Sequence, residues 1–190
     1  MGRPYAIVVS GVPRSGTSLV MQMLAAGGIE PLCDGARPPD AANPRGYFEL
    51  EAVKRTRRDA SWLAQAEGRA VKVIHALLPA LPRERAYRVI LVRRDLREVL
   101  ASQRAMLAGP EAPRDSLDDD RLTRIFEAQL REAEAWVRAA PRAALLAVDH
   151  AALLTDPARE ARALAAFLDG GLDVGAMAAA VDPALHRQRR

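Results

Sequence analysis

The sequence predicts a three-layer α/β/α domain built around a mostly parallel central sheet. Short apolar runs of the kind that form buried strands alternate with longer stretches of helical periodicity. The run 87–92 is almost wholly apolar, as expected for a parallel strand that is buried on both faces. The 190 residues fit one domain, residues 1–190, because domains commonly hold about 100–200 residues.

The expected elements alternate along the whole chain. Strands are expected over residues 6–10, 29–32, 70–75, 87–92 and 144–149. Helices are expected between the first loop and the glycine pair at 27–28, within 51–67, after Asp95, over 119–139, and from Asp156 to the glycine pair at 170–171. Asp95 and Asp156 stand where N-cap residues accept backbone hydrogen bonds. The apolar stripe of residues 119–139 predicts that this helix packs on the core.

Two long segments lack any periodicity. Residues 34–46 hold three prolines and two glycines, which predicts a loop that directly follows the first helical unit and forms a wall of a substrate cleft. Residues 109–120 are polar and acidic with two prolines, which predicts a solvated loop and a candidate lid over a cofactor.

Charge and composition narrow the class of protein. A hydrophobic content of 49% with 27% charged residues is typical of a folded globular protein. The formal net charge of +4 comes mainly from arginine, since Lys54 and Lys72 are the only lysines. The arginines are scattered without a block of like charge, so no nucleic-acid partner is expected. A basic surface does suit a polyanionic cofactor.

The rare residue types and the lack of long apolar stretches exclude further classes of protein. The single cysteine, Cys33, cannot form an internal disulfide, and the three histidines lack ligand spacing, so no metal site is expected. No apolar stretch reaches the ~18 residues that a membrane span needs, and no targeting segment is recognised. We therefore expect a cytoplasmic protein without membrane association.

The first strand leads through a glycine-framed loop into a helix, and this turn is the clearest functional signal. Backbone N–H groups and the positive end of the helix dipole gather at such a turn, which suits a phosphate or sulfate group. Gly11 and Gly16 frame the loop as in the phosphate loop of nucleotide-binding proteins, which favours a P-loop-NTPase-like fold. Thr17 stands where that loop has lysine, so we expect Arg14 to supply the cation.

The loop Pro13-Arg14-Ser15-Gly16-Thr17-Ser18 resembles the 5′-phosphosulfate loop of sulfotransferases that use 3′-phosphoadenosine 5′-phosphosulfate (PAPS). Arg94 and Ser102 resemble the family's 3′-phosphate signature, an arginine at a strand end and a serine eight residues later. Residues 43–49 resemble the asparagine-proline-x-glycine-x-x-glutamate segment of many bacterial sulfotransferases. The main blocks of resemblance stand in the family's order, near residues 6–24, 88–107 and 144–170.

This resemblance implies PAPS as the donor, bound by Pro13, Arg14, Ser15, Gly16, Thr17 and Ser18 and, at its 3′-phosphate, by Arg94 and Ser102. It implies sulfuryl transfer to a hydroxyl or amine of a small-molecule or carbohydrate acceptor, with Arg14 stabilising the leaving phosphate. A base must remove the acceptor proton, and His75 and Glu49 are the candidates. His75 is slightly favoured, because it follows a predicted central strand and an imidazole accepts a proton near neutral pH.

Two other classes of function stay open. A nucleotide or small-molecule kinase is disfavoured by the missing loop lysine, and a non-catalytic nucleotide-binding module is disfavoured by the scattered charge. The arginine-lysine-glycine segment that closes over the nucleotide in cytosolic sulfotransferases is absent from residues 185–190, which leaves the adenine contacts unassigned. Neither the acceptor nor the oligomeric state follows from the sequence.

Overall fold

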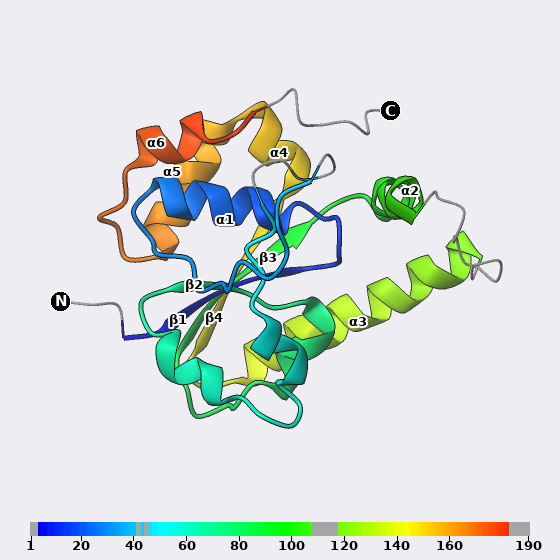
Figure 1. Cartoon of the computed structure of the whole chain (residues 1–190), viewed down its shortest axis with the longest axis horizontal. Coiled ribbons are helices and arrows are strands. Elements are labelled where there is room, and N and C mark those ends of the chain that lie inside the picture. The colour runs from blue at the N-terminus through cyan, green and yellow to red at the C-terminus, as the bar shows by residue number, and fades with distance from the viewer. Residues whose placement is uncertain (1–3, 41–42, 44–45, 108–117, 183–190) are drawn as a thin grey trace.

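The computed structural model describes residues 4–40, 43, 46–107 and 118–182, and in this part of the chain four strands form one parallel sheet in the order β2-β1-β3-β4. The strands are β1 Ala6–Gly11, β2 Ala70–Lys72, β3 Tyr87–Arg93 and β4 Ala143–Asp149. The α-helices are α1 Thr17–Ala26, α2 Leu96–Leu107, α3 Asp119–Ala139, α4 His150–Thr155, α5 Pro157–Phe167 and α6 Val174–Ala179 (Figure 1). Three 3₁₀ helices, η1 Glu51–Arg55, η2 Ser61–Gln65 and η3 His75–Ala80, lie on either side of β2 in the sequence.

The two inner strands, β1 and β3, pair along their whole common length, with Gly11 beside Val92 at the end of the register. Every residue of β1 is buried. A strand that is covered on both faces must be apolar throughout, which explains the uninterrupted apolar runs in the sequence. Because all four strands are parallel, their carboxyl ends meet at one edge of the sheet.

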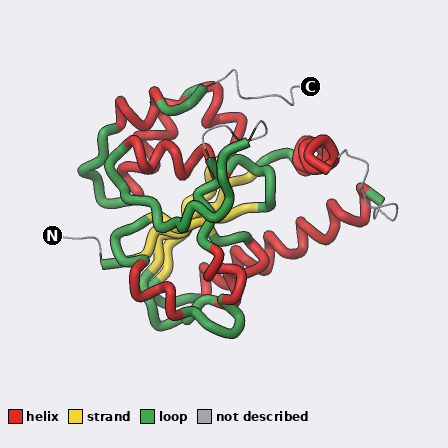
Figure 2. Tube along the Cα trace, viewed as in Figure 1, coloured by secondary structure: helices red, strands yellow, loops and turns green. Residues whose placement is uncertain are grey.

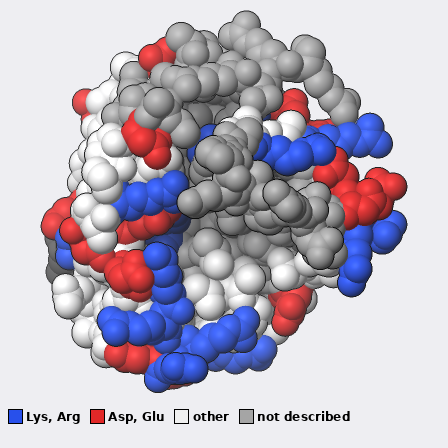
Figure 3. Space-filling model, turned by 45° about the vertical axis from the view of Figure 1, so that its right-hand side comes forward, with Lys and Arg blue, Asp and Glu red and all other residues white. Residues whose placement is uncertain are grey.

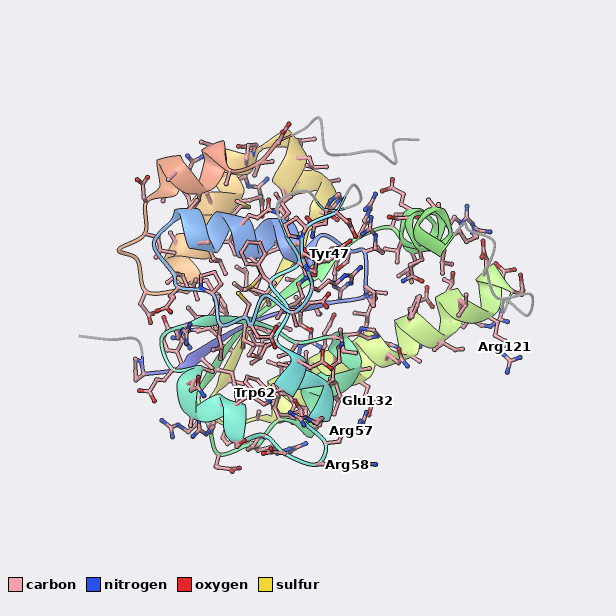
Figure 4. The ribbon with its side chains drawn as sticks, viewed as in Figure 1. Tyr47, Arg57, Arg58, Trp62, Arg121 and Glu132 are labelled. Carbon is pink, nitrogen blue, oxygen red and sulfur yellow. The ribbon has the colours of Figure 1, made fainter. Side chains whose placement is uncertain are left out.

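Helices cover both faces of this sheet (Figures 1 and 2). On one face, Val20 of α1, Leu164 of α5 and Met177 of α6 belong to one buried apolar cluster. On the other face, Trp62 of η2 and Trp136 of α3 belong to a second cluster, and Figure 4 shows Trp62 in this layer. The predicted three-layer α/β/α arrangement with a parallel sheet is therefore confirmed.

The prediction of a strand over residues 29–32 is wrong. Pro31 makes an isolated bridge to Ala70, flanked by bonds from Ala70 N to Glu30 O (3.0 Å) and from Leu32 N to Ala70 O (2.7 Å). Proline has no N–H to donate, so the pairing cannot extend into a regular strand.

The strand predicted over residues 70–75 is shorter and lies elsewhere in the sheet than expected. β2 ends at Lys72 and pairs only with β1, so it is an edge strand and not a central one. Val73 still donates its N–H to Val9 O (3.0 Å), and the chain then turns into η3 at His75. A strand held on one side only can end early, because a 3₁₀ turn satisfies its backbone groups instead.

Residues 51–67, predicted as one or two helices, form η1 and η2, in which Trp62 and Leu63 point inward as expected. Helix α3 has the predicted bounds. Its second half is core, since Ala133, Trp136 and Val137 are buried. Its first half extends beyond the sheet and is only partly buried (Figure 1), so the apolar stripe is core for about half its length.

Basic and acidic side chains are interspersed over the face that Figure 3 shows. None of the described helices is both long enough and apolar enough to cross a membrane. The candidate lid falls largely on residues 108–117, which lie outside the described residues. Residues 183–190, at the end of the sequence, also lie outside them.

Candidate functional site

A cleft of about 790 Å³ opens at the carboxyl edge of the sheet, over the loop that joins β1 to α1. Its walls come from this loop, the first turn of α1, η1, the end of β2, the β3–α2 junction and the start of α4. Tyr47 lies beside the N-terminal end of α1 (Figure 4). Gly16, Thr17 and Ser18 line the cleft, which places the positive dipole end of α1 there, and no side chain caps this end of the helix.

Gly16 is required by its backbone conformation and by its neighbour. Its φ of +103° is strained for any residue with a side chain. A Cβ at this position would lie 2.4 Å from Cδ2 of the buried His150, at the start of α4. The imidazole therefore packs directly on the loop backbone.

Arg14 also has a left-handed backbone, with φ of +75°, which is uncommon outside glycine. Three side chains from the β3–α2 unit hold it there. Arg94 Nη1 donates to Arg14 O (3.2 Å), Gln103 Nε2 donates to Pro13 O (3.0 Å), and Arg14 Nε donates to Ser102 Oγ (3.0 Å). The two predicted phosphate sites thus meet at Arg14.

Arg94 is almost buried, with 9% of its side chain exposed. Its Nε donates to Glu98 Oε2 (3.0 Å), but its buried Nη2 has no hydrogen-bond partner among the described residues. The buried Ser15 Oγ of the loop is also without a partner among them. Unsatisfied buried donors are costly, and an anion bound beside them would supply acceptors.

Lys72, the last residue of β2, brings a second cation to the loop. Its Nζ donates to Ser18 Oγ (2.9 Å) and to Tyr47 O. The expectation that only Arg14 could supply a cation is therefore wrong, because β2 lies next to β1 and its end reaches the loop. Desolvation by burial lowers the pKa of Lys72 to about 8, and the charges of Arg37 and Arg14 act in the same direction while Glu49 opposes them.

The hydroxyl of Ser18 is oriented by its neighbours. Its oxygen accepts hydrogen bonds from Lys72 Nζ (2.9 Å) and from Asn43 Nδ2 (3.0 Å). Asn43 also donates to Gly46 O (2.6 Å), which fixes the amide in place. With both acceptor sites of the hydroxyl filled, its O–H is left as a donor. Thr17 lines the cleft beside it.

His75 lies below the loop and not in the cleft. The residue is 3% exposed, and it is not among the described residues that line the cleft. Nδ1 lies 3.1 Å from Gly11 O and Nε2 lies 2.8 Å from Gln129 Oε1, while Phe126 packs against the ring edge to face. A backbone carbonyl only accepts, so Nδ1 donates to Gly11 O, while Nε2 faces the side-chain amide of Gln129, and neither ring nitrogen is open to a substrate.

Glu49 does line the cleft, with 31% of its side chain exposed. Its Oε1 accepts from Arg37 Nη1 (3.2 Å), and the Arg37 guanidinium lies 3.4 Å from the centre of the Tyr47 ring. Glu49 and Lys72 line the same cleft, so the carboxylate shares this space with the cation that reaches the loop. Its position suits a proton acceptor better than that of His75.

Sequence reasoning missed Lys72 and gave His150 no role. Lys72 is a lone lysine at the end of a predicted strand. Its proximity to the loop can be inferred only once the strand order shows that this strand pairs with β1. In the described part of the chain, no group of three or more His, Cys, Asp or Glu residues could hold a metal ion.

Comparisons with known proteins agree with this geometry. A model of the sulfotransferase family matches residues 43–173, a range that includes Arg94 and Ser102 but begins after the loop. The chain is similar to the sulfotransferase domain of the olefin synthase from Synechococcus PCC 7002, with 18% identity and a TM-score of 0.52 over 97% of this chain and 87% of that one. At this identity the likeness shows the fold. No protein with curated annotation matches the sequence.

The packing of His150 on Gly16 predicts a position-specific loss of stability. Gly28 also has a positive φ (+96°) but has no atom within 4 Å of its would-be Cβ, so it is a matched control. Gly28→Ala should lower the free energy of unfolding by about 1–2 kcal/mol, through backbone strain alone. Gly16→Ala should lower it by about 1–3 kcal/mol more, because of the clash.

Urea unfolding of both variants measures this difference. Adding His150→Ala to Gly16→Ala should remove most of the excess loss. Equal losses at Gly16 and Gly28 would contradict the described contact.

Proposed function

The chain belongs to the sulfotransferase family, and from this premise we propose that it transfers a sulfuryl group from PAPS to a hydroxyl or amine of a small-molecule acceptor. The observation that carries the proposal is the convergence on Arg14. The β1–α1 loop, Arg94 and Ser102 are joined there by hydrogen bonds, which suits a donor that carries two anionic groups on one nucleoside.

The residues present fit such a donor. The loop of residues 13–18 would hold the phosphosulfate through backbone N–H groups, Arg14 and the Ser18 hydroxyl. Arg94 and Ser102 would hold the 3′-phosphate, and the unpaired Nη2 of Arg94 would gain an acceptor. The bound donor would supply an activated sulfuryl group.

Arg14 and Lys72 then have a catalytic role. As the acceptor oxygen bonds to sulfur, the S–O bond to the donor phosphate breaks and leaves its electron pair on the phosphate. The cations of Arg14 and Lys72 stabilise this growing negative charge in a site that is partly closed to water. Glu49 takes the proton from the acceptor hydroxyl or amine in the same step.

His75 supports the site in a different way. Its Nδ1–H holds Gly11 O at the start of the loop, and Gln129 fixes the far side of the ring. We therefore assign His75 as a positioning residue and Glu49 as the base, which reverses the order that the sequence favoured.

The kinase alternative is not settled by the loop alone. Thr17 stands where the phosphate loop has lysine, but Lys72 supplies a cation to the same loop from the next strand. The family match favours sulfuryl transfer, and nucleotide preference separates the two activities by experiment.

Nucleotide binding should depend on the 3′-phosphate. Adenosine 3′,5′-bisphosphate should bind about 10–100-fold more tightly than AMP, because a charged hydrogen bond contributes about 1.5–3 kcal/mol. Isothermal titration calorimetry of wild type, Arg94→Ala and Arg97→Ala measures this preference. Arg94→Ala should lose most of it, and Arg97→Ala, which changes an exposed arginine three residues later in the first turn of α2, should keep it. Tighter binding of ATP with magnesium than of the bisphosphate would favour the kinase.

The pKa of about 8 for Lys72 predicts that anion affinity falls in alkaline solution. Below pH 8 Lys72 is protonated in the free protein, so its titration does not change the affinity for adenosine 3′,5′-bisphosphate as the pH varies in this range. Above pH 8 the free lysine loses its proton and the bound anion restores it, so affinity falls by up to about tenfold per pH unit. Lys72→Arg should remove the dependence between pH 8 and 9.5, and a flat wild-type profile would refute the linkage.

The two base candidates should separate in steady-state kinetics. Glu49→Gln should lower kcat by about 10²–10⁴-fold, because it removes the proton acceptor and keeps the size. His75→Asn should lower the stability or the nucleotide affinity more than it lowers kcat. If His75→Asn abolishes turnover with nucleotide affinity intact and Glu49→Gln does not, the assignment is reversed.

A further inference from the structure

One side of the cleft is apolar, and the proposed donor contacts do not use it. Leu50 and Val53 approach from η1, and Val73, Ile74 and Leu77 approach from the segment between β2 and η3. Leu50 directly follows Glu49 in the chain and Val73 directly follows Lys72, and all four residues line the cleft, so this wall adjoins the proposed base and the second cation. The inference below rests on the proposed function and concerns what this wall binds.

Ile74 distinguishes the wall from ordinary core. At 42% exposure it is the one large hydrophobic side chain in the described part of the chain that is exposed. Its neighbours Val73 and Leu77 are buried in the second apolar cluster, so the backbone of this segment is anchored while Ile74 faces the cleft. An exposed isoleucine held beside a reactive site is suited to contact a ligand.

The charged groups on this side of the cleft are engaged in ion pairs or hydrogen bonds within the protein. Arg37 pairs with Glu49 and lies over the Tyr47 ring, and Lys54 pairs with Glu51 at 2.7 Å. Lys72 is bonded to Ser18 and to Tyr47 O. A sugar bound here would lose its water without finding partners for most of its hydroxyls, which is unfavourable.

We infer that the acceptor carries its hydroxyl on an apolar skeleton, aliphatic or aromatic, and is not a carbohydrate. The skeleton contacts Ile74 and Leu77, and the hydroxyl faces the Glu49 carboxylate. Burial of apolar surface then supplies the affinity, and the single hydroxyl supplies the orientation for transfer.

The test compares alcohols that each contain a six-membered ring and differ in polarity. Cyclohexanol and 2-phenylethanol are compared with myo-inositol and methyl glucoside, using PAPS as donor. Binding of each acceptor to protein saturated with adenosine 3′,5′-bisphosphate is measured separately by saturation-transfer NMR. We expect the apolar alcohols to bind and to show kcat/KM at least about tenfold above the polyols, because each methylene contact in an apolar pocket discriminates by about 10–200-fold.

Ile74→Asn and Ile74→Leu are the matched variants, and neither threatens the fold because Ile74 is exposed. Ile74→Asn should reduce cyclohexanol binding and kcat/KM by about tenfold, with the nucleotide dissociation constant unchanged, and Ile74→Leu should retain both. Preference for myo-inositol, no effect of Ile74→Asn, or no binding of either alcohol would overturn the inference.

Failure of the proposed function gives a different result. In that case adenosine 3′,5′-bisphosphate does not bind, and NMR on the protein alone still shows whether cyclohexanol binds and whether Ile74→Asn removes the signal. Binding that depends on Ile74 would support the apolar site, and its absence would overturn it.

Discussion

The hydrogen bonds that hold Arg14 in a left-handed backbone connect the parts of the site that are far apart in the sequence. A non-glycine residue in this conformation costs on the order of 1–3 kcal/mol and persists only where its surroundings fix it. Arg94 holds the carbonyl of Arg14 and Ser102 accepts from its side chain, so the β3–α2 unit sets the shape of the β1–α1 loop. A change at either element therefore alters the geometry of the other.

The parallel sheet explains why these residues meet at all. Each strand contributes at its carboxyl end: β1 leads into the loop, β2 ends at Lys72, β3 precedes Arg94, and β4 precedes His150. Open α/β sheets commonly bind ligands at this edge. The polar groups of the site stand at the ends of strands that are fixed by two apolar cores, which keeps the site in place.

The sequence predicts the parts that depend on local pattern. The bounds of α3, the strands β1, β3 and β4 and the glycine-framed loop follow from periodicity and turn residues, and their prediction is confirmed. The roles of Lys72 and His75 depend on strand order and on where β2 ends, which a single sequence does not encode locally. The sequence assigns the loop cation to Arg14 because Lys72 is distant from the loop along the chain, and it favours His75 as the base because it predicts a longer, central strand over residues 70–75.

A crystal structure with adenosine 3′,5′-bisphosphate tests the central claim most directly. We predict that the 5′-phosphate accepts hydrogen bonds from the loop of residues 13–18 and from Lys72, and that the 3′-phosphate lies against Arg94 and Ser102. A nucleotide whose 3′-phosphate points into solvent, or whose 5′-phosphate lies away from the first turn of α1, would contradict the account.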